Sequence, residues 1–345
     1  MPYRNRFNLR EDSNPFRRDF LDCIQRNLDH DAFVRVGRYR LLAEASGVVC
    51  KAAEADAPCF LLITGPDGAG RTSIANCLIH EYAVRWRARH LPPDPAAAAR
   101  QPTVPLILRP RMGEPGKDRD FLSRWLGDID DLADRNTAIT IREDRTPSKL
   151  REQFRTLRDD TAAEDLSTGV ARLVRDVNRS GFGLATVVEK IHYAGYITSL
   201  FTMLSRAPAL TIFTGTTLGE LGARLQLAFD SCRADAVMMH HVSLSAATGE
   251  TMRELVRTWW QRAAEPEHPM PPIDLDGVAD GFAPELETVG RALRILAYMI
   301  DDLSEQPGAY DRAQTSSKIK RFRENALAYV TGTGGGGGTS LGDAR

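Results

Sequence analysis

The chain has 345 residues, of which 45 are basic and 46 acidic, so its net charge is −1 at pH 7. This balance excludes a protein whose overall field recruits nucleic acid or an anionic membrane. No run approaches the ~20 apolar residues that span a bilayer, and the first residues lack the apolar core of a signal peptide. The five cysteines are scattered and form no CxxC pair. We therefore expect a cytoplasmic protein with reduced thiols and no membrane partner.

Residues 1–30 form a polar segment that contains five arginines among its first eighteen residues. Asn14-Pro15-Phe16 is expected to open a helix from Arg17 to Leu28. The favoured interpretation is a solvated arm, because acidic residues are interspersed with the arginines. A second interpretation is that the arginines contact phosphate or an acidic partner.

Short apolar runs then alternate with helical patterns, which indicates a parallel sheet with crossover helices. Each run is typical of a strand buried on both faces. The expected strands are Cys59–Thr64, Val104–Arg109, Leu184–Glu189, Ala209–Thr214 and Val237–Leu244. His240-His241 lies in the last run and is interpreted as half-buried strand and not as a pair of metal ligands.

Three further segments complete the expected organisation. A charged insertion at 110–181 separates the second and third strands, and from Pro147 to Asn178 apolar residues recur at helical spacing. After the last strand the pattern is helical over Thr248–Ala264 and Leu286–Leu303. The sequence thus predicts an α/β core at 31–246, a helical lid at 247–330 and a disordered glycine-rich tail at 331–345.

The most specific motif follows the first strand. It is Gly65-Pro-Asp-Gly-Ala-Gly-Arg-Thr-Ser73, and it fits the P-loop pattern GxxxxG[K]T in every slot except that of the lysine, where Arg71 stands. Glycines let backbone N–H groups wrap a phosphate at the start of the next helix, and Thr72 would place its hydroxyl on Mg²⁺. A glycine-rich turn that binds nothing is the alternative. The candidate binding residues are Gly65, Pro66, Asp67, Gly68, Ala69, Gly70, Arg71, Thr72 and Ser73.

With this loop in place, the order of motifs resembles the AAA+ superfamily, nearest to its origin-recognition and STAND-like branch. Upstream, Gly37 and Arg38 stand in a segment similar to the box that lines the adenine pocket in that branch. The resemblance covers about residues 33–303. It implies a parallel five-stranded P-loop NTPase core with a C-terminal helical lid, and ATP with Mg²⁺ as the ligand.

The third strand resembles the Walker B segment of that family, which carries two adjacent acids. Here Glu189 is the one acid and Lys190 follows it. In the preferred register Glu189 is the metal ligand and Lys190 stands where the catalytic Glu would orient water. A shift by one residue makes Glu189 the catalytic residue and puts Val188 at the metal position. An ordinary buried strand that ends in a surface Glu-Lys pair is the third interpretation.

Further residues occupy family positions. Thr214 and Thr216 end the fourth strand, where the family senses the γ-phosphate. Arg224 resembles an arginine finger directed at a neighbouring subunit. In the lid, Arg291, in preference to Arg294, resembles the sensor-2 arginine that meets the phosphates.

Because both Walker motifs are altered, the favoured function is a nucleotide-binding switch or scaffold with weak or no hydrolysis. It would work through a protein partner and assemble as a homo-oligomer. The first alternative is an active ATPase or remodelling subunit that uses Arg71 and Glu189. The second is a DNA-associated initiator or transposition-helper ATPase, disfavoured by the neutral charge.

Overall fold

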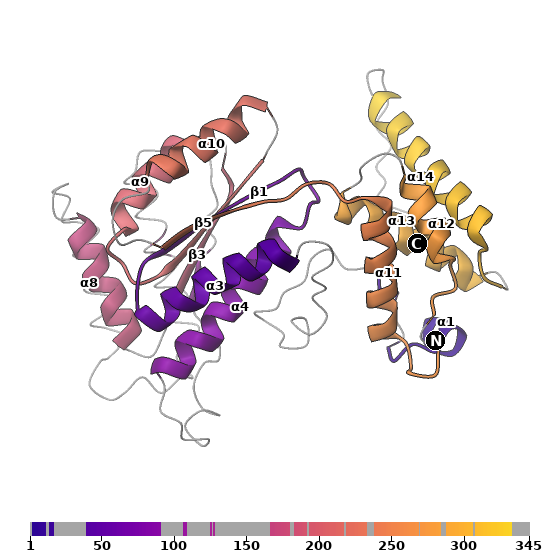
Figure 1. The fold of residues 1–345 in the computed structure, drawn as a ribbon, viewed down its shortest axis with the longest axis horizontal. Helices are drawn as coiled ribbons and strands as arrows, with labels where there is room; N and C mark the ends of the chain where they lie inside the picture. Colours follow the sequence, from indigo (N-terminus) through magenta and orange to yellow (C-terminus); the bar gives the residue numbers. More distant parts are fainter. Residues whose placement is uncertain are drawn as a thin grey trace. The chain divides into compact units, whose positions relative to one another are not determined.

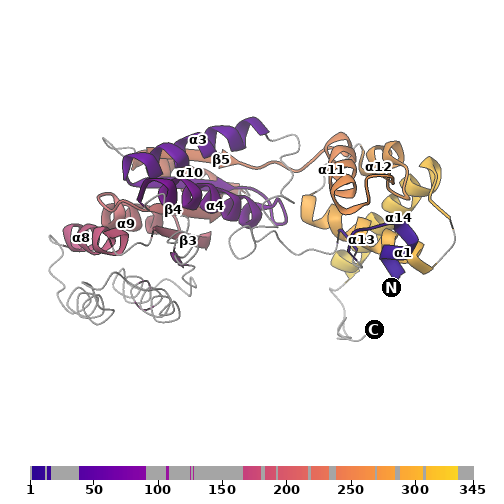
Figure 2. The same cartoon turned by 90° about the horizontal axis from the view of Figure 1, so that it is seen from below.

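A computed structural model describes most of the chain. The described residues are 2–11, 14–16, 39–90, 106–108, 125, 127, 166–179, 183–191, 193–216, 219–232, 238–268, 270–283, 288–305 and 308–332. They divide into two compact units (Figures 1 and 2). Unit 1 joins Met1–Asp19 to Ala246–Arg345, and unit 2 comprises Phe20–Ser245.

Unit 2 is built on a five-stranded parallel sheet with the order β2-β3-β4-β1-β5. The strands are β1 Cys59–Thr64, β2 Leu106–Leu108, β3 Leu184–Ile191, β4 Leu210–Gly215 and β5 Met238–Ser243. In the register of the sheet, Thr64 is level with Gly215 of β4 and with Ser243 of β5. The carboxyl ends of these three strands therefore lie at one edge. The predicted α/β fold class is confirmed.

Helices cover both faces of this sheet (Figure 1). They are α3 Tyr39–Ala55, α4 Arg71–His90, α8 Leu166–Arg179, α9 Gly195–Leu204 and α10 Gly219–Ser231. Side chains of β1 alternate between two cores: Leu61 and Ile63 pack with α3 and α4, whereas Phe60 and Leu62 pack with α8, α9 and α10. This alternation explains why the strand is apolar at every position from Cys59 to Ile63.

The expected insertion at 110–181 contributes to the core of unit 2. Its described residues are Trp125, Gly127 and those in α8 from Leu166 onward, so the predicted helix before 166 lies outside the described residues. Trp125 is fully buried, and its Nε1 donates to the Thr186 hydroxyl at 3.0 Å. One part of the insertion is therefore anchored on β3.

Unit 1 is helical. It contains α1 Pro2–Phe7, α11 Gly249–Ala263, α12 Leu275–Phe282, α13 Val289–Glu305 and α14 Arg312–Gly332. The two predicted helices are found as α11 and α13 with small shifts at their ends. The prediction of a disordered tail from 331 is wrong for Thr331 and Gly332, which belong to α14, and residues 333–345 lie outside the described residues.

The N-terminal segment packs inside unit 1, so the solvated-arm interpretation is wrong for residues 2–11 and 14–16. Phe7, Leu9 and Phe16 are 8%, 1% and 2% exposed. Leu9 forms an antiparallel bridge with Ala264, and Asn14 Nδ2 donates to the Ala297 carbonyl at 2.8 Å. The predicted helix from residue 17 to 28 lies outside the described residues. The apolar side chains at positions 7, 9 and 16 are the sequence feature that indicated burial and that the interpretation as a solvated arm overlooked.

Two glycines give a matched test of this packing. At Gly249 a Cβ would lie 2.1 Å from the Ala279 carbonyl oxygen of α12, whereas a Cβ at Gly47 in α3 would meet nothing within 4 Å. We expect Gly249→Ala to lower the free energy of unfolding of unit 1 by about 1–3 kcal/mol, because backbone must move. Gly47→Ala is expected to raise that of unit 2 by up to ~1 kcal/mol through helix propensity. Urea titration followed by circular dichroism measures both free energies of unfolding. Equal changes in the two variants would contradict the close packing of Gly249 against α12.

Candidate functional site

The predicted phosphate loop connects β1 to α4 at the carboxyl edge of the sheet. Gly68 and Gly70 have φ values of 78° and 89°. Glycine adopts these angles without the steric cost that other residues incur. The Ala69 amide donates to the Pro66 carbonyl at 3.1 Å, which closes the turn before the helix begins at Arg71.

Several backbone amides of the loop are free to bind a ligand. The N–H groups of Gly68, Gly70 and Thr72 donate to no other residue that the structure describes. Thr72 is in the first turn of α4, where N–H groups have no partner within the helix and the helix dipole is positive. Such an arrangement fits an anion, and above all a phosphate.

Arg71 is held by three acceptors around the loop. Its Nη1 donates to the Gly65 carbonyl at 3.0 Å and to the Gly215 carbonyl at 2.5 Å. Its Nη2 pairs with the Asp67 carboxylate at 2.5 Å. The Arg71 side chain is 13% exposed, whereas that of Asp67 is 93% exposed. The guanidinium therefore links the ends of β1 and β4 beneath the loop.

The end of β4 contacts the loop directly. The Gly65 amide donates to the Gly215 carbonyl at 3.2 Å. The predicted sensor residues flank that glycine: Thr214 is buried within β4, and Thr216 follows the strand and is half-buried. The structure thus brings the loop and both threonines to one edge of the sheet.

The predicted Walker B residues lie on β3, the neighbour of β4. The pairing of β3 with β4 is irregular between Val188 and Ile191, and Ile191 pairs with Gly215. Glu189 and Lys190 occupy this irregular stretch near the carboxyl edge, and Glu189 is half-buried. The Lys190 side chain lies outside the described structure. The metal role of Glu189 with Thr72 stays a prediction.

The remaining predicted residues belong to other segments of the chain. Gly37 and Arg38 lie outside the described residues. Arg291 belongs to unit 1, where its Nη2 donates to the Arg323 carbonyl at 3.3 Å. Arg294 is exposed on the same helix. On α10, Arg224 is 66% exposed and pairs with Glu220 at 2.6 Å. Their phosphate and subunit roles stay predictions.

A contact that the sequence did not predict joins β1 to β5 beside the loop. His241 Nε2 and the Thr64 hydroxyl are 2.8 Å apart. Burial lowers the pKa of His241 below its usual 6.5; the charge of Asp230 opposes this and that of His240 adds to it. His241 is thus a strand residue, as predicted, and it prefers the neutral form.

This pKa shift predicts a pH dependence of stability. Because the folded state holds the proton less tightly than the unfolded state, the stability contributed by neutral His241 is complete above about pH 6.5. It is lost as the pH falls from there through the lowered pKa. We expect His241→Gln to lose less stability than the original chain between about pH 7.5 and pH 5.5. Urea titrations at both pH values measure this, with the exposed His268→Gln as the control. An unchanged pH dependence in His241→Gln would contradict it.

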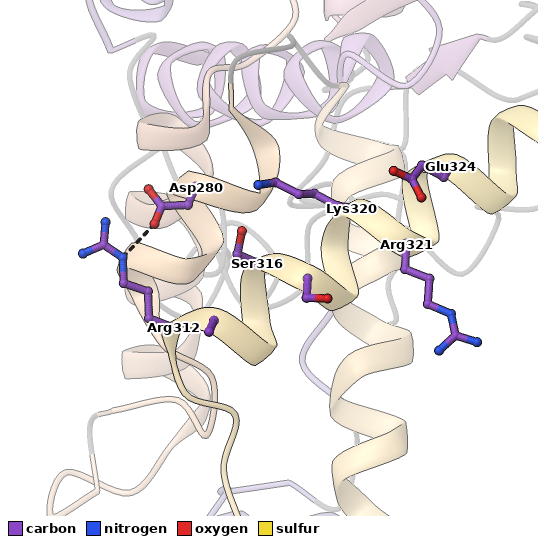
Figure 3. Close-up of a pocket in the computed structure, with 8 residues that line it drawn as sticks. Asp280, Arg312, Ser316, Lys320, Arg321 and Glu324 are labelled. Atoms are coloured by element: carbon purple, nitrogen blue, oxygen red, sulfur yellow. Dashed lines mark hydrogen bonds and ion pairs between the residues drawn. The ribbon is translucent and has the colours of Figure 1, made fainter.

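Unit 1 has a groove of about 600 Å³ between α12 and α14. Figure 3 shows the Arg312 guanidinium paired with Asp280, while that of Arg321 points away from them. Three cationic side chains and two carboxylates line the groove: Arg312, Lys320, Arg321, Asp280 and Glu324. Most of the positive charge is therefore balanced, which does not favour a long polyanion.

Comparison with known proteins adds weak structural similarities. Neither a protein-family model nor a curated protein matches the chain. The solved ORC1 protein of Aeropyrum pernix in complex with DNA is 15% identical, with a TM-score of 0.48 over 87% of this chain and 69% of that one. Drosophila ORC bound to DNA is 12% identical, with a TM-score of 0.47 over 86% and 63%. The Walker-type ATPase paby2304 of Pyrococcus abyssi is 12% identical, with a TM-score of 0.48 over 84% and 73%.

At these identities the similarity concerns the fold and transfers no ligand, partner or activity to this chain. Among the described helices, none is both long and apolar enough to cross a bilayer. The described residues also contain no group of three or more His, Cys, Asp or Glu side chains placed to hold a metal ion.

Proposed function

We propose that the chain binds a nucleotide, ATP with Mg²⁺, and acts as a switch or scaffold with weak or no hydrolysis through protein partners. The observation that carries this proposal is the set of unpaired N–H groups of Gly68, Gly70 and Thr72 at the start of α4. Backbone donors at a helix N-terminus bind phosphate regardless of which side chains surround them.

The surrounding side chains define the expected roles. The Thr72 hydroxyl and the Glu189 carboxylate would hold Mg²⁺, whose charge neutralises phosphate oxygens when it is bound. Phosphoryl transfer also needs a group that positions the attacking water. Lys190 follows Glu189, where the AAA+ family that the sequence resembles has a second acid. Because one acid cannot both hold the metal and position the attacking water, we expect the chain to bind nucleotide and to hydrolyse it slowly or not at all.

One interaction would convert binding into a signal. A ligand shifts a conformational equilibrium only by its differential affinity for the two states. We propose Arg224 as a contact with a neighbouring copy, whereas the phosphate role of Arg291 stays a prediction from the sequence. A mass measurement with an ATP analogue bound tests the role of Arg224: a strictly monomeric chain would exclude it.

Nucleotide binding and turnover should be measured on one purified sample. Calorimetric titration with ATP and Mg²⁺ is paired with a phosphate-release assay. Saturable binding without release supports the switch or scaffold. Binding with steady release at the rates usual for ATPases refutes weak hydrolysis and favours the remodelling alternative. No binding refutes the proposal.

Substitution of Gly70 tests whether the loop is the site. Its φ of 89° strains any residue with a side chain, and a Cβ there meets nothing within 4 Å, so the fold has room for it. We expect Gly70→Val to weaken ATP binding at least about tenfold, because strain of ~1–3 kcal/mol displaces the amides. Calorimetry measures this beside Gly47→Ala as the control. Unchanged affinity in Gly70→Val would place the nucleotide elsewhere.

DNA association is not favoured by the described contacts. Arg6 Nη1 donates to the Ser304 carbonyl at 2.9 Å, and Arg10 Nε donates to the Ala264 carbonyl at 3.2 Å. Two arginines of the N-terminal segment therefore stabilise unit 1. Salt-sensitive binding of duplex DNA to the full chain would instead favour the alternative function, a DNA-associated initiator or transposition-helper ATPase.

A further inference from the structure

The position of the Arg71 side chain affects how many phosphates of a nucleotide the loop can contact. In a loop with lysine at this slot, backbone amides hold the α- and β-phosphates, and the lysine reaches the β- and γ-phosphates. A lysine ammonium is a compact charge on a flexible stem, whereas a guanidinium is a planar fork with five N–H donors. Replacing one by the other changes which phosphates a cation reaches.

Most of the donors of Arg71 are already used. Nη1 donates to both the Gly65 and the Gly215 carbonyls, and Nη2 donates to Asp67. Two of the five N–H groups, that of Nε and one of Nη2, have no partner among the described residues. The guanidinium thus fills the space between the loop and the end of β4, beside the predicted γ-phosphate sensors Thr214 and Thr216.

Two further observations oppose a third phosphate. The Arg71 side chain is 13% exposed, so its displacement would leave two carbonyls without a charged donor in a shielded place. Asp67 adds a carboxylate at the same loop. Like charges at short range repel, so this carboxylate disfavours added negative charge.

We propose that the loop recognises the diphosphate part of a nucleotide alone, and that Arg71 sets this specificity. Nucleoside diphosphates and triphosphates then bind with similar affinity. The inference rests on the proposed nucleotide binding and names the ligand class of that same site. It also means that loss of the γ-phosphate does not release the ligand.

The test compares Mg²⁺-ADP with Mg²⁺-ATP by calorimetry on the full chain. For the original chain we expect dissociation constants within about threefold of each other, well below the tenfold that 1.4 kcal/mol would produce. Arg71→Lys is expected to favour ATP by at least about tenfold, because the ammonium is free to reach the third phosphate. Arg85→Lys is the matched control: it lies on the same helix, 56% exposed and paired with Glu54, and should preserve parity.

The outcomes separate two failures. Binding of ATP much more tightly than ADP by the original chain would overturn the inference while leaving nucleotide binding intact. Equal affinities for ATP and ADP in a folded Arg71→Lys variant would also overturn the inference. If that variant does not fold, Asp67→Asn provides the same test, since it removes the negative charge that pairs with Nη2. Equal affinities for ATP and ADP in the Asp67→Asn variant would then show that Arg71 does not determine the specificity for the diphosphate. Binding of neither nucleotide by the original chain would refute the proposed function itself.

Discussion

Replacing Phe16 with alanine is expected to lower the free energy of unfolding of unit 1 by about 3–5 kcal/mol. The Phe16 ring is 2% exposed and stacks on Trp259, with 6.4 Å between centroids and 5° between planes. It also packs against Trp260 at 6.4 Å. Truncation removes this buried surface and leaves a cavity that rigid helices fill only in part. Trp259 and Trp260 of unit 1 are two of the four tryptophans, so tryptophan fluorescence during urea unfolding reports the change.

The matched control for Phe16 is Leu227→Ala. Leu227 lies on α10 of unit 2 and is 71% exposed. Its truncation should change stability by no more than ~0.5 kcal/mol. If Phe16→Ala costs no more than Leu227→Ala, the N-terminal segment does not pack in unit 1 in solution.

Replacing Trp125 with alanine is expected to destabilise unit 2 by about 3–5 kcal/mol. Trp125 is fully buried among residues of β3, α8 and α9, and it brings the insertion into the sheet core. Its Nε1–H is bonded to the Thr186 hydroxyl at 3.0 Å, so both polar groups are paired in a buried place. The loss therefore combines a cavity with an unpaired hydroxyl.

A double-mutant cycle separates those two contributions. Thr186→Val leaves the indole N–H buried without an acceptor and should cost about 1–3 kcal/mol. In the Trp125→Phe background the same change should cost less, because the donor is already absent. Calorimetric unfolding of the four chains measures the coupling. Additive effects would show that the bond contributes nothing to stability.

The strands were predictable because each is an apolar run buried on both faces. β1 was predicted with both ends correct, since Pro58 precedes it and the glycine loop follows. The described part of β2, Leu106–Leu108, lies within the predicted Val104–Arg109, whereas β3 ends at Ile191, two residues beyond the predicted Glu189. Apolar composition does not show where hydrogen-bonded pairing with a neighbour stops, so strand ends were less certain than strand positions.

The loop of the candidate site was predicted from glycine spacing, but the partners of Arg71 were not. One of them is the Gly215 carbonyl, 144 positions further along the chain. A backbone carbonyl carries no side-chain signature, and the proximity of two positions so far apart arises only from the pairing of β1 with β4. The burial of Trp125 was missed for the same reason: the charged sequence around it indicates exposure, and Thr186 lies 61 positions away.

The packing of the N-terminal segment also has a consequence for folding during translation. Phe7, Leu9 and Phe16 emerge from the ribosome before the helices that bury them, which begin at residue 249. At about 5–20 residues per second, these side chains stay without their partners for tens of seconds while unit 2 is synthesised. Unit 1 therefore closes only after its helices α11 to α14 have been synthesised. A product that ends before these helices would leave Phe7, Leu9 and Phe16 without the side chains that bury them.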